Sequence, residues 1–256
     1  MSNPLARFSD RADNYAKYRP GYPGGVIETL KSNCELSETS VIADVGSGTG
    51  ILSELFLKNS NYVFAVEPNA AMRKTCENLL KNYPKFVSID GTAEATTLPT
   101  GSVDFVSAAQ AFHWFDRPKA KREFTRILKP GGWVVLVWNE RHLNSTAFLR
   151  DYEDLLLRYG TDYETVRHEN VSSEIALFFA PEPFELRTLE NAQHFDFEAL
   201  KGRLLSSSYA PNQDQPNFDA MLSELQEIFD RSQKQGIVSF EYDTKVYYGH
   251  LGATGL

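Results

Sequence analysis

Cysteine is scarce in this chain, with two among its 256 residues, Cys34 and Cys76. Neither belongs to a CxxC pair or to a metal-ligand spacing, and two cysteines in a chain of this length do not indicate a disulfide scaffold. The sequence therefore predicts two ordinary thiols and no metal site. It also lacks internal repeats and low-complexity segments.

Long apolar runs and clustered cations are missing as well. The longest apolar run, WVVLVW at 133–138, is far too short to cross a bilayer, and the N-terminal MSNPLARFSDRADN has no apolar signal core. We expect a cytoplasmic protein without a membrane partner. The formal net charge is −8 and no block is rich in Lys or Arg. Because a phosphate backbone binds clustered cations, we expect a small-molecule substrate and no nucleic acid.

The most informative stretch is VIADVGSGTG at 41–50, followed by VFAVEP, which ends at Glu67 and Pro68. A buried strand that ends in a glycine-rich turn lets a ligand touch bare backbone, since glycine accepts positive φ and has no side chain. Glu67 ends the next strand, where a carboxylate can accept both hydroxyl protons of a ribose. This layout predicts a nucleoside-binding α/β domain.

The glycine spacing separates two classes of cofactor. A dinucleotide needs GxGxxG, because its pyrophosphate rests on the helix N-terminus. Here Gly46, Gly48 and Gly50 form GxGxG, and Asp44 places a negative charge before them. That charge repels a diphosphate but can hold the ammonium of an amino acid, directly or through water. The pattern favours S-adenosylmethionine; a glycine-rich turn of another α/β protein is the alternative.

Strands and helices alternate through the N-terminal half. Strands are expected at 41–45, 62–66, 86–89, 103–108 and 133–139, with helices at 70–83 and 118–128 and another beginning at Ile51. A KPGG turn leads into the fifth strand. Five strands with crossover helices predict a doubly wound, Rossmann-like parallel sheet.

The C-terminal part has a different pattern. Period-two alternation at 184–189 and 236–248 predicts an antiparallel pair that extends the sheet to seven mostly parallel strands. Apolar steps of three and four residues predict helices at 148–159, 197–206 and 218–234. We expect a single domain, 1–256, with these parts: an N-terminal helical lid segment at 1–39, a cofactor-binding core at 40–139, and lid helices with the final strands at 140–256.

Five motifs in order resemble the class I S-adenosylmethionine-dependent methyltransferases: VIADVGSGTG, VFAVEP, DGTAEATTLP, VDFVSAAQAFHWFD and LKPGGWVVLVWN. Any one alone would be weak, whereas five in order are specific. FSDRADNYAKYRPGYP near the start and AQAFHWFD resemble the branch that includes trans-aconitate methyltransferase-like small-molecule enzymes. The class resemblance covers 40–139, and the branch resemblance extends more loosely over most of the chain.

The resemblance implies roles for the residues that match its motifs. Gly46, Gly48 and Gly50 would accommodate the methionyl and ribose parts of the cofactor, Asp44 would help hold the amino group, and Glu67 would bind the ribose hydroxyls. Two pairs would complete the cofactor site: Pro68 with Met72 against the adenine, and Ala109 with Gln110 near the methionyl chain and sulfonium.

One position departs from the pattern implied by the resemblance. Many relatives have an acidic side chain that bonds the adenine amino group where this chain has Thr92. We expect the backbone of Ala93, with the side chain of Thr92 or Glu94, to replace it.

Methyl transfer is an in-line displacement at a carbon activated by sulfonium, so the protein mainly aligns the nucleophile and excludes water. A carboxylate acceptor needs no base, whereas a hydroxyl or amine must lose a proton. His113, at a strand-end motif, can take that proton, or it can shape the pocket by hydrogen bonding. Trp114, Phe112 and Phe115 are expected to form an apolar wall, with core packing as the alternative for at least one of them.

Four further residues are substrate-pocket candidates. Tyr18 and Arg19 precede a PGYP turn that suits a lid edge over the cofactor, or a solvated helix end. Arg141, just past the fifth strand, can pair with an acidic substrate or the cofactor carboxylate, or form an ordinary surface salt bridge. Tyr209, in SSSYAP, is the fourth candidate.

These features predict transfer of a methyl group to a small organic acceptor, through its carboxylate or hydroxyl. Two other classes stay open: a nicotinamide-dependent oxidoreductase, which the GxGxG spacing and Asp44 disfavour, and a non-catalytic S-adenosylmethionine-binding protein. An NPPY-type turn, found in many nucleic-acid methyltransferases, is absent. Glu153 and Asp154 are predicted to lie on a solvated helix face and not to form an acid/base pair.

Overall fold

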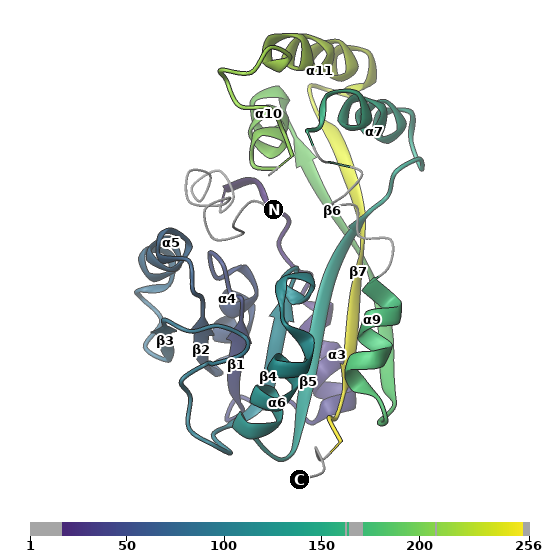
Figure 1. Cartoon of the computed structure of the whole chain (residues 1–256). Coiled ribbons are helices and arrows are strands. Elements are labelled where there is room, and N and C mark those ends of the chain that lie inside the picture. The colour runs from purple at the N-terminus through teal and green to yellow at the C-terminus, as the bar shows by residue number, and fades with distance from the viewer. Residues whose placement is uncertain (1–16, 162, 164–170, 208, 253–256) are drawn as a thin grey trace.

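A seven-stranded sheet runs through the computed structural model, which describes residues 17–161, 163, 171–207 and 209–252 (Figure 1). Its strands are β1 Val41–Val45, β2 Tyr62–Val66, β3 Phe86–Ile89, β4 Val103–Ala109, β5 Leu128–Arg141, β6 Phe184–Phe195 and β7 Val238–Gly249. Their order is β3-β2-β1-β4-β5-β7-β6. The first five pair in parallel, and β7 is antiparallel to both β5 and β6. The doubly wound, mostly parallel sheet with an antiparallel C-terminal pair is thereby confirmed.

Helices cover both faces of this sheet and the far ends of β6 and β7. They are α3 Gly25–Cys34, α4 Ile51–Lys58, α5 Ala70–Leu80, the short 3-10 helix η2 Phe112–Trp114, α6 Arg117–Ile127, α7 Ala147–Tyr159, α9 Val171–Phe179, α10 Phe197–Leu205 and α11 Phe218–Ser232. Successive residues of each strand face opposite sides. One buried layer therefore joins the strands to α3, α4 and α5, and the other joins them to α6 and α9. Helix α9 was not expected from the sequence.

Helix α3 corrects the expected role of the N-terminal segment. Its buried residues Val26, Leu30 and Cys34 pack in the same cluster as Ile42 of β1 and Val246 of β7. It is therefore a helix of the core, because its apolar stripe faces the sheet and not the ligand. Residues 1–16 of the predicted lid segment lie outside the described residues.

Strands β5 and β6 are longer than their sequence patterns indicated. The KPGG segment expected as a turn belongs to β5, where pairing with β4 shifts register between Leu128 and Trp133. Strand β6 continues past Leu189 to Phe195, paired with β7 throughout. Most side chains of β6 are exposed or half-buried, and no apolar alternation marks its continuation past Leu189. The backbone ladder with β7 defines the strand instead.

Helices α7, α10 and α11 gather around the far ends of β6 and β7, and we call this group the cap (Figure 1). They share a third apolar cluster with strand β7, centred on Phe240 and Tyr152, whose rings lie 4.8 Å apart. The cap stands beyond the carboxyl ends of β1, β4 and β5 (Figure 1). The predicted helices at 148–159, 197–206 and 218–234 are confirmed within two residues at their ends.

Across the described ranges, every helix is too short or too polar to span a bilayer. The same ranges contain no group of three or more His, Cys, Asp or Glu side chains placed to hold a metal ion. Both cysteines are buried and carry free thiols.

Candidate active site

A cavity of about 350 Å³ lies at the carboxyl ends of the parallel strands. Its walls come from the segments that follow β1, β2, β3 and β4. Strands β1 and β4 are neighbours in the sheet, but the chain continues from β1 to β2 on one side and from β4 to β5 on the other. Such a switch point is where doubly wound sheets bind ligands, and the volume falls within the usual range for a small-molecule site, roughly 300–1,000 Å³.

Most of the predicted cofactor residues line this cavity. They are Asp44, Gly46, Gly48, Glu67, Pro68, Met72, Thr92, Ala93, Glu94, Ala109 and Gln110, joined by the acceptor-wall residues Trp114 and Phe115 and by Tyr22 of the PGYP turn. The lining also includes six residues that were not predicted: Ser47, Thr49, Ile51, Leu52, Asn69 and Ala111. Ser47 and Thr49 stand between the glycines of the motif, so their position in the turn could have predicted that they line the cofactor site.

The glycine turn is held against the second strand. The N–H groups of Gly46 and Ser47 donate to the carbonyl of Val66, at 2.8 and 3.1 Å. Gly48, at φ +56°, donates its N–H to Oε2 of Glu67 at 2.9 Å, and a Cβ there would meet nothing within 4 Å. Gly48 is therefore the glycine that faces open space in the cavity.

Gly50 does not line the cavity, so its predicted place in the cofactor site is not supported by the geometry. It has φ +86°, and a Cβ there would lie 2.6 Å from Sγ of Cys76 and 2.7 Å from Cδ1 of Leu80. This glycine is needed because α4 packs closely against α5.

Glu67 connects the turn to the end of β2. Its Oε2 accepts the Gly48 N–H, and its Oε1 accepts the Asn69 N–H at 2.8 Å. Burial raises the pKa of Glu67 above its ordinary value, while these hydrogen bonds and the charge of Arg73 oppose the rise. A carboxylate has about four acceptor positions, so both oxygens can still accept hydroxyl groups from a ligand.

Asp44 is a buried carboxyl in the floor of the cavity, 1% exposed. Its oxygens accept hydrogen bonds from Oγ of Ser53 at 2.6 Å and Oγ of Ser107 at 3.2 Å. Burial raises the pKa of Asp44 to about 6, and the two serines only partly oppose this. A cation placed beside Asp44 would favour its charged form.

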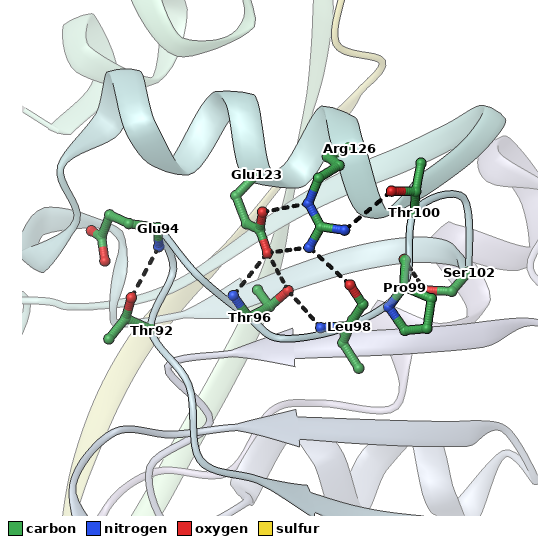
Figure 2. Close-up of polar contacts among 9 residues, drawn as sticks. All are labelled: Thr92, Glu94, Thr96, Leu98, Pro99, Thr100, Ser102, Glu123 and Arg126. Atoms are coloured by element: carbon green, nitrogen blue, oxygen red, sulfur yellow. Dashed lines mark hydrogen bonds and ion pairs between the residues drawn. The ribbon is translucent and has the colours of Figure 1, made fainter.

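The loop after β3 brings Thr92, Ala93 and Glu94 to the cavity and is secured by α6 (Figure 2). Oε1 of Glu123 accepts both the N–H and the hydroxyl of Thr96, at 2.8 and 2.5 Å, and Arg126 donates to both carboxylate oxygens of Glu123. Arg126 also donates to the carbonyl of Leu98 at 2.8 Å. These bonds place the loop, and Figure 2 shows Thr92 beside Glu94 at its cavity end.

Gln110 ends β4 in a strained conformation, with φ +53°. Its N–H donates to the carbonyl of Val137 at 3.1 Å, and its Nε2 donates to the carbonyl of Asn139 at 2.9 Å. A non-glycine residue with positive φ persists only where its surroundings hold it. The two bonds to β5 do so and fix Gln110 in the cavity wall.

His113 lies in η2 and is not among the residues that line the cavity. Its ring is 4.4 Å from the ring of Trp114 and 5.4 Å from that of Trp138, measured between centroids. Trp114 is 39% exposed and lines the cavity. Phe112 is fully buried, 4.9 Å from Phe178, so it is the aromatic residue of this motif that packs in the core.

Tyr18, Arg19, Arg141 and Tyr209 lie outside the cavity lining. Arg141 pairs with Glu153, and both side chains are about nine-tenths buried, at 11% and 10% exposure. Of the alternatives for Arg141, the salt bridge is present but buried and not at the surface, and the prediction that Glu153 is solvated was wrong. Glu153 belongs to the inward stripe of α7, whereas its neighbour Asp154 is exposed as predicted.

Comparison with known proteins agrees with this geometry. A model of the methyltransferase domain matches residues 43–136. An uncharacterized methyltransferase of Mycobacterium tuberculosis is 32% identical over 205 residues, which cover 79% of this chain and 76% of that protein. An uncharacterized methyltransferase-like protein of Schizosaccharomyces pombe is 33% identical over 159 residues. That match covers 62% of this chain and 60% of the yeast protein, so less than two thirds of that relative's length is matched.

Solved structures show the same fold at lower identity. A protein of Anaeromyxobacter dehalogenans matches with a TM-score of 0.67 and 22% identity over 91% of this chain and 98% of that one. An Aquifex aeolicus protein described as a SAM-dependent methyltransferase matches with a TM-score of 0.51 and 18% identity, over 75% and 94%. The sheet order and the cavity at its switch point define a Rossmann-like α/β protein. The chain belongs to the methyltransferase family.

The family and the cavity together identify the cofactor as S-adenosylmethionine. Asp44 offers a carboxylate for an ammonium, and Glu67 offers one for two ribose hydroxyls. The hydroxyls of Ser47 and Thr49 are buried in the lining, and neither has a hydrogen-bond partner among the described residues. Buried hydroxyls normally find a partner, so both are available to donate to the methionyl carboxylate. The lining therefore fits the cofactor.

The affinity for the cofactor is expected to depend on pH through Asp44. Its pKa of about 6 in the free protein means that the carboxyl is largely protonated at pH 5. Binding the cofactor ammonium requires the charged form, so the affinity should fall as the pH decreases below about 6, by at most roughly tenfold per pH unit. Calorimetric titration with S-adenosylhomocysteine between pH 5 and 7 measures this slope.

Asp44→Asn is the control for that titration. An asparagine keeps an acceptor oxygen for one of the two serine hydroxyls but carries no charge, so affinity should be lower at pH 7 and the slope smaller. Any slope left in the variant belongs to Glu67, whose pKa burial also raises. An affinity of the unaltered protein that stays constant from pH 7 to pH 5 would exclude contact between Asp44 and the ammonium.

Proposed function

We propose that this chain transfers the methyl group of S-adenosylmethionine to a small organic acceptor, through its carboxylate or hydroxyl. The supporting observation is the cavity itself, in which two carboxylates and the glycine turn meet the exposed aromatic ring of Trp114. The net charge of −8 favours a small molecule over a nucleic acid. We retain the likeness to the trans-aconitate methyltransferase-like branch, the cytoplasmic location and the absence of a membrane partner as parts of this proposal.

The residues of the cavity contribute alignment more than chemistry. When bound, the cofactor supplies a methyl carbon activated by its sulfonium. Glu67 and Asp44 hold its two ends, and the strained Gln110 fixes the wall at the end of β4. Trp114 and Phe115 present apolar surface where the acceptor meets the cofactor, so they keep water from the reacting atoms.

His113 is the candidate for a base or a positioning group. Because it lies beside Trp114 and outside the cofactor lining, His113→Gln is expected to reduce turnover of a hydroxyl acceptor by about 10²- to 10⁴-fold if His113 is the base, with little change in cofactor affinity. Turnover and S-adenosylhomocysteine affinity are measured together. His194→Gln, on β6 with a bond to Ser239, is the matched control. An undiminished rate in His113→Gln would leave the residue only a packing role.

Thermal unfolding with S-adenosylmethionine, S-adenosylhomocysteine or NADH tests the proposal. Ligand at about 100 times its dissociation constant stabilises a protein by about 2.7 kcal/mol, which raises the midpoint of a domain of this size by several degrees. A shift with the first two ligands alone is expected. A shift with NADH alone would favour a nicotinamide-dependent oxidoreductase. Cofactor binding without turnover on any acceptor of a broad panel would favour a non-catalytic binding protein.

A further inference from the structure

Two buried arginines lie near Tyr152, at the junction of the cap and the sheet. Arg141 ends β5, and Arg203 lies in α10 with 6% of its surface exposed. The guanidinium of Arg141 lies 5.2 Å from the ring centre of Tyr152, a fully buried residue of α7. The charges of both arginines act on the Tyr152 hydroxyl, and burial outweighs them in raising its pKa. We call Arg141, Arg203, Tyr152 and the neighbouring Tyr209 the arginine cluster.

In the described part of the chain, the arginine cluster contains two cations, and one carboxylate is paired with them. Arg141 pairs with Glu153 and donates to the hydroxyl of Tyr163 at 3.2 Å. Arg203 donates to Oγ of Ser207 at 3.1 Å, and the structure pairs it with no carboxylate among the described residues. Guanidinium groups stay charged in proteins, so Arg203 is a buried cation that pairs with no carboxylate of the described residues. Such a group is costly unless it is paired.

Donor atoms in this cluster are also unsatisfied. Nη1 of Arg141, Nε of Arg203 and the hydroxyl of Tyr152 are buried, and none has a hydrogen-bond partner in the described part of the chain. Native structures leave few buried donors unpaired. Three donors from β5, α10 and α7, two of them on cations, are the arrangement that an oxyanion satisfies.

Solvent can reach the cluster at Tyr209 and Arg19. Tyr209 is half-buried, and its ring lies 4.8 Å from that of Tyr163. Burial raises the pKa of Tyr209, but the charges of Arg203, Arg19 and Arg141 more than offset this, so its pKa lies below the ordinary value. Arg19 is also half-buried and donates to the carbonyl of Ser206 at 3.1 Å.

The cluster stands next to the cofactor cavity. Asn139, two residues before Arg141 on β5, accepts a hydrogen bond from the cavity residue Gln110 and donates to the carbonyl of Gly21, which precedes the cavity residue Tyr22. Two residues of a strand span about 7 Å. The cavity wall is thus hydrogen-bonded to the strand that ends at Arg141, and Figure 1 shows the cap beyond the end of the sheet where the cavity lies.

We propose that the arginine cluster binds an oxyanion of the methyl acceptor, a carboxylate or a phosphate, and makes the enzyme selective for small organic anions. This inference rests on the proposed function, because it assigns acceptor binding to the part of the proposed active site that lies toward the cap. The planar fork of a guanidinium matches either oxyanion. The anchored group is distinct from the atom that receives the methyl group, since the cluster lies outside the cofactor cavity.

Titration with simple anions tests the assignment. Citrate, succinate and inorganic phosphate are added at constant ionic strength, with succinamide as the uncharged match for succinate, in the presence and absence of S-adenosylhomocysteine. Thermal unfolding should show stabilisation by at least one anion and none by succinamide. Citrate or succinate acting alone indicates a carboxylate site, whereas phosphate acting alone indicates a phosphate site.

Three variants locate the effect. Tyr152→Phe removes one hydroxyl and keeps the buried ring, so it should fold and bind the anion about tenfold more weakly, the loss expected for one hydrogen bond to a charged group. Arg203→Met should abolish the anion effect. Arg187→Gln, on the exposed face of β6, should match the unaltered protein. Affinity for S-adenosylhomocysteine should be the same in all of them.

Three results would overturn the inference. The first is that no anion stabilises the protein more than succinamide does. The second is that anions stabilise Tyr152→Phe and Arg203→Met as much as the unaltered protein. The third is that these variants lose S-adenosylhomocysteine affinity together with anion affinity, which would assign the cluster to the cofactor carboxylate. If S-adenosylhomocysteine fails to bind the unaltered protein, the proposed function fails, and the titration without it still decides whether the cluster binds an anion.

Discussion

Replacing Gly50 with alanine is expected to lower the free energy of unfolding by about 2 to 5 kcal/mol. The left-handed backbone at φ +86° costs an alanine roughly 1–2 kcal/mol. The added Cβ would also lie 2.6 Å from Sγ of Cys76 and 2.7 Å from Cδ1 of Leu80, and overpacking of this kind costs about 1–3 kcal/mol. Urea unfolding, measured without cofactor, gives the difference directly.

Gly48→Ala is the matched control, because both glycines belong to the GxGxG motif but only Gly50 packs against side chains of α5. Gly48 has φ +56° and would place a Cβ in open space, so only the backbone cost of roughly 1–2 kcal/mol applies. Equal destabilisation by the two substitutions would show that close packing of α4 on α5 is not what requires Gly50.

Replacing Glu67 with alanine is expected to weaken cofactor binding by about 1.5 to 3 kcal/mol, the usual value of hydrogen bonds to a charged group. That corresponds to a dissociation constant roughly 10 to 150 times larger. The substitution removes the proposed acceptor of the ribose hydroxyls together with the acceptor of the Gly48 and Asn69 N–H groups. Calorimetric titration with S-adenosylhomocysteine measures the change.

Glu67→Gln and Glu77→Ala separate the parts of this effect. Glutamine keeps one acceptor oxygen near the turn but loses the charge, so its affinity should lie between those of the unaltered protein and Glu67→Ala. Glu77 is a carboxylate of α5 that accepts a bond from Ser88 and does not line the cavity, so its removal should leave affinity unchanged. An unchanged affinity in Glu67→Ala would contradict the assigned binding mode.

The core strands could be predicted from the sequence because packing in the sheet makes each a mostly apolar run bounded by turns. Strands β1 and β2 match the predicted bounds, and β4 differs by one residue. Strand β6 could be predicted only to Leu189, since its later residues are polar and its pairing with β7 is a matter of backbone bonds. The segment 1–39 was predicted to be a helical lid, but the sequence did not show that α3 packs against the sheet.

The cofactor side of the site was predictable for a local reason. Asp44, the glycines and Glu67 follow directly after strands, and parallel strands bring their carboxyl ends to one edge. Gly50 was misassigned because a glycine needed for helix packing and one needed for a ligand look alike in a motif. The acceptor side depends on contacts far apart in the chain. Arg203 stands in a helix beside Gly202, whose Cα approaches the Tyr18 ring so closely that a Cβ would lie 2.2 Å from it. No spacing rule predicts such a contact.

The long strands that carry the cap affect how the molecule can open. Strands β5 and β7 pair without interruption from Val134 and Gly249, inside the core, to Arg141 and Tyr242, beneath the cap. Rotating the whole cap away from the core would break the hydrogen bonds between β5 and β7, and the N–H and C=O groups that they join would lose their partners. The cap and core are therefore expected to behave as one rigid, cooperatively unfolding unit. Ligand entry must then depend on side chains and loops around the cavity, such as Trp114 and the PGYP turn, moving against a fixed frame.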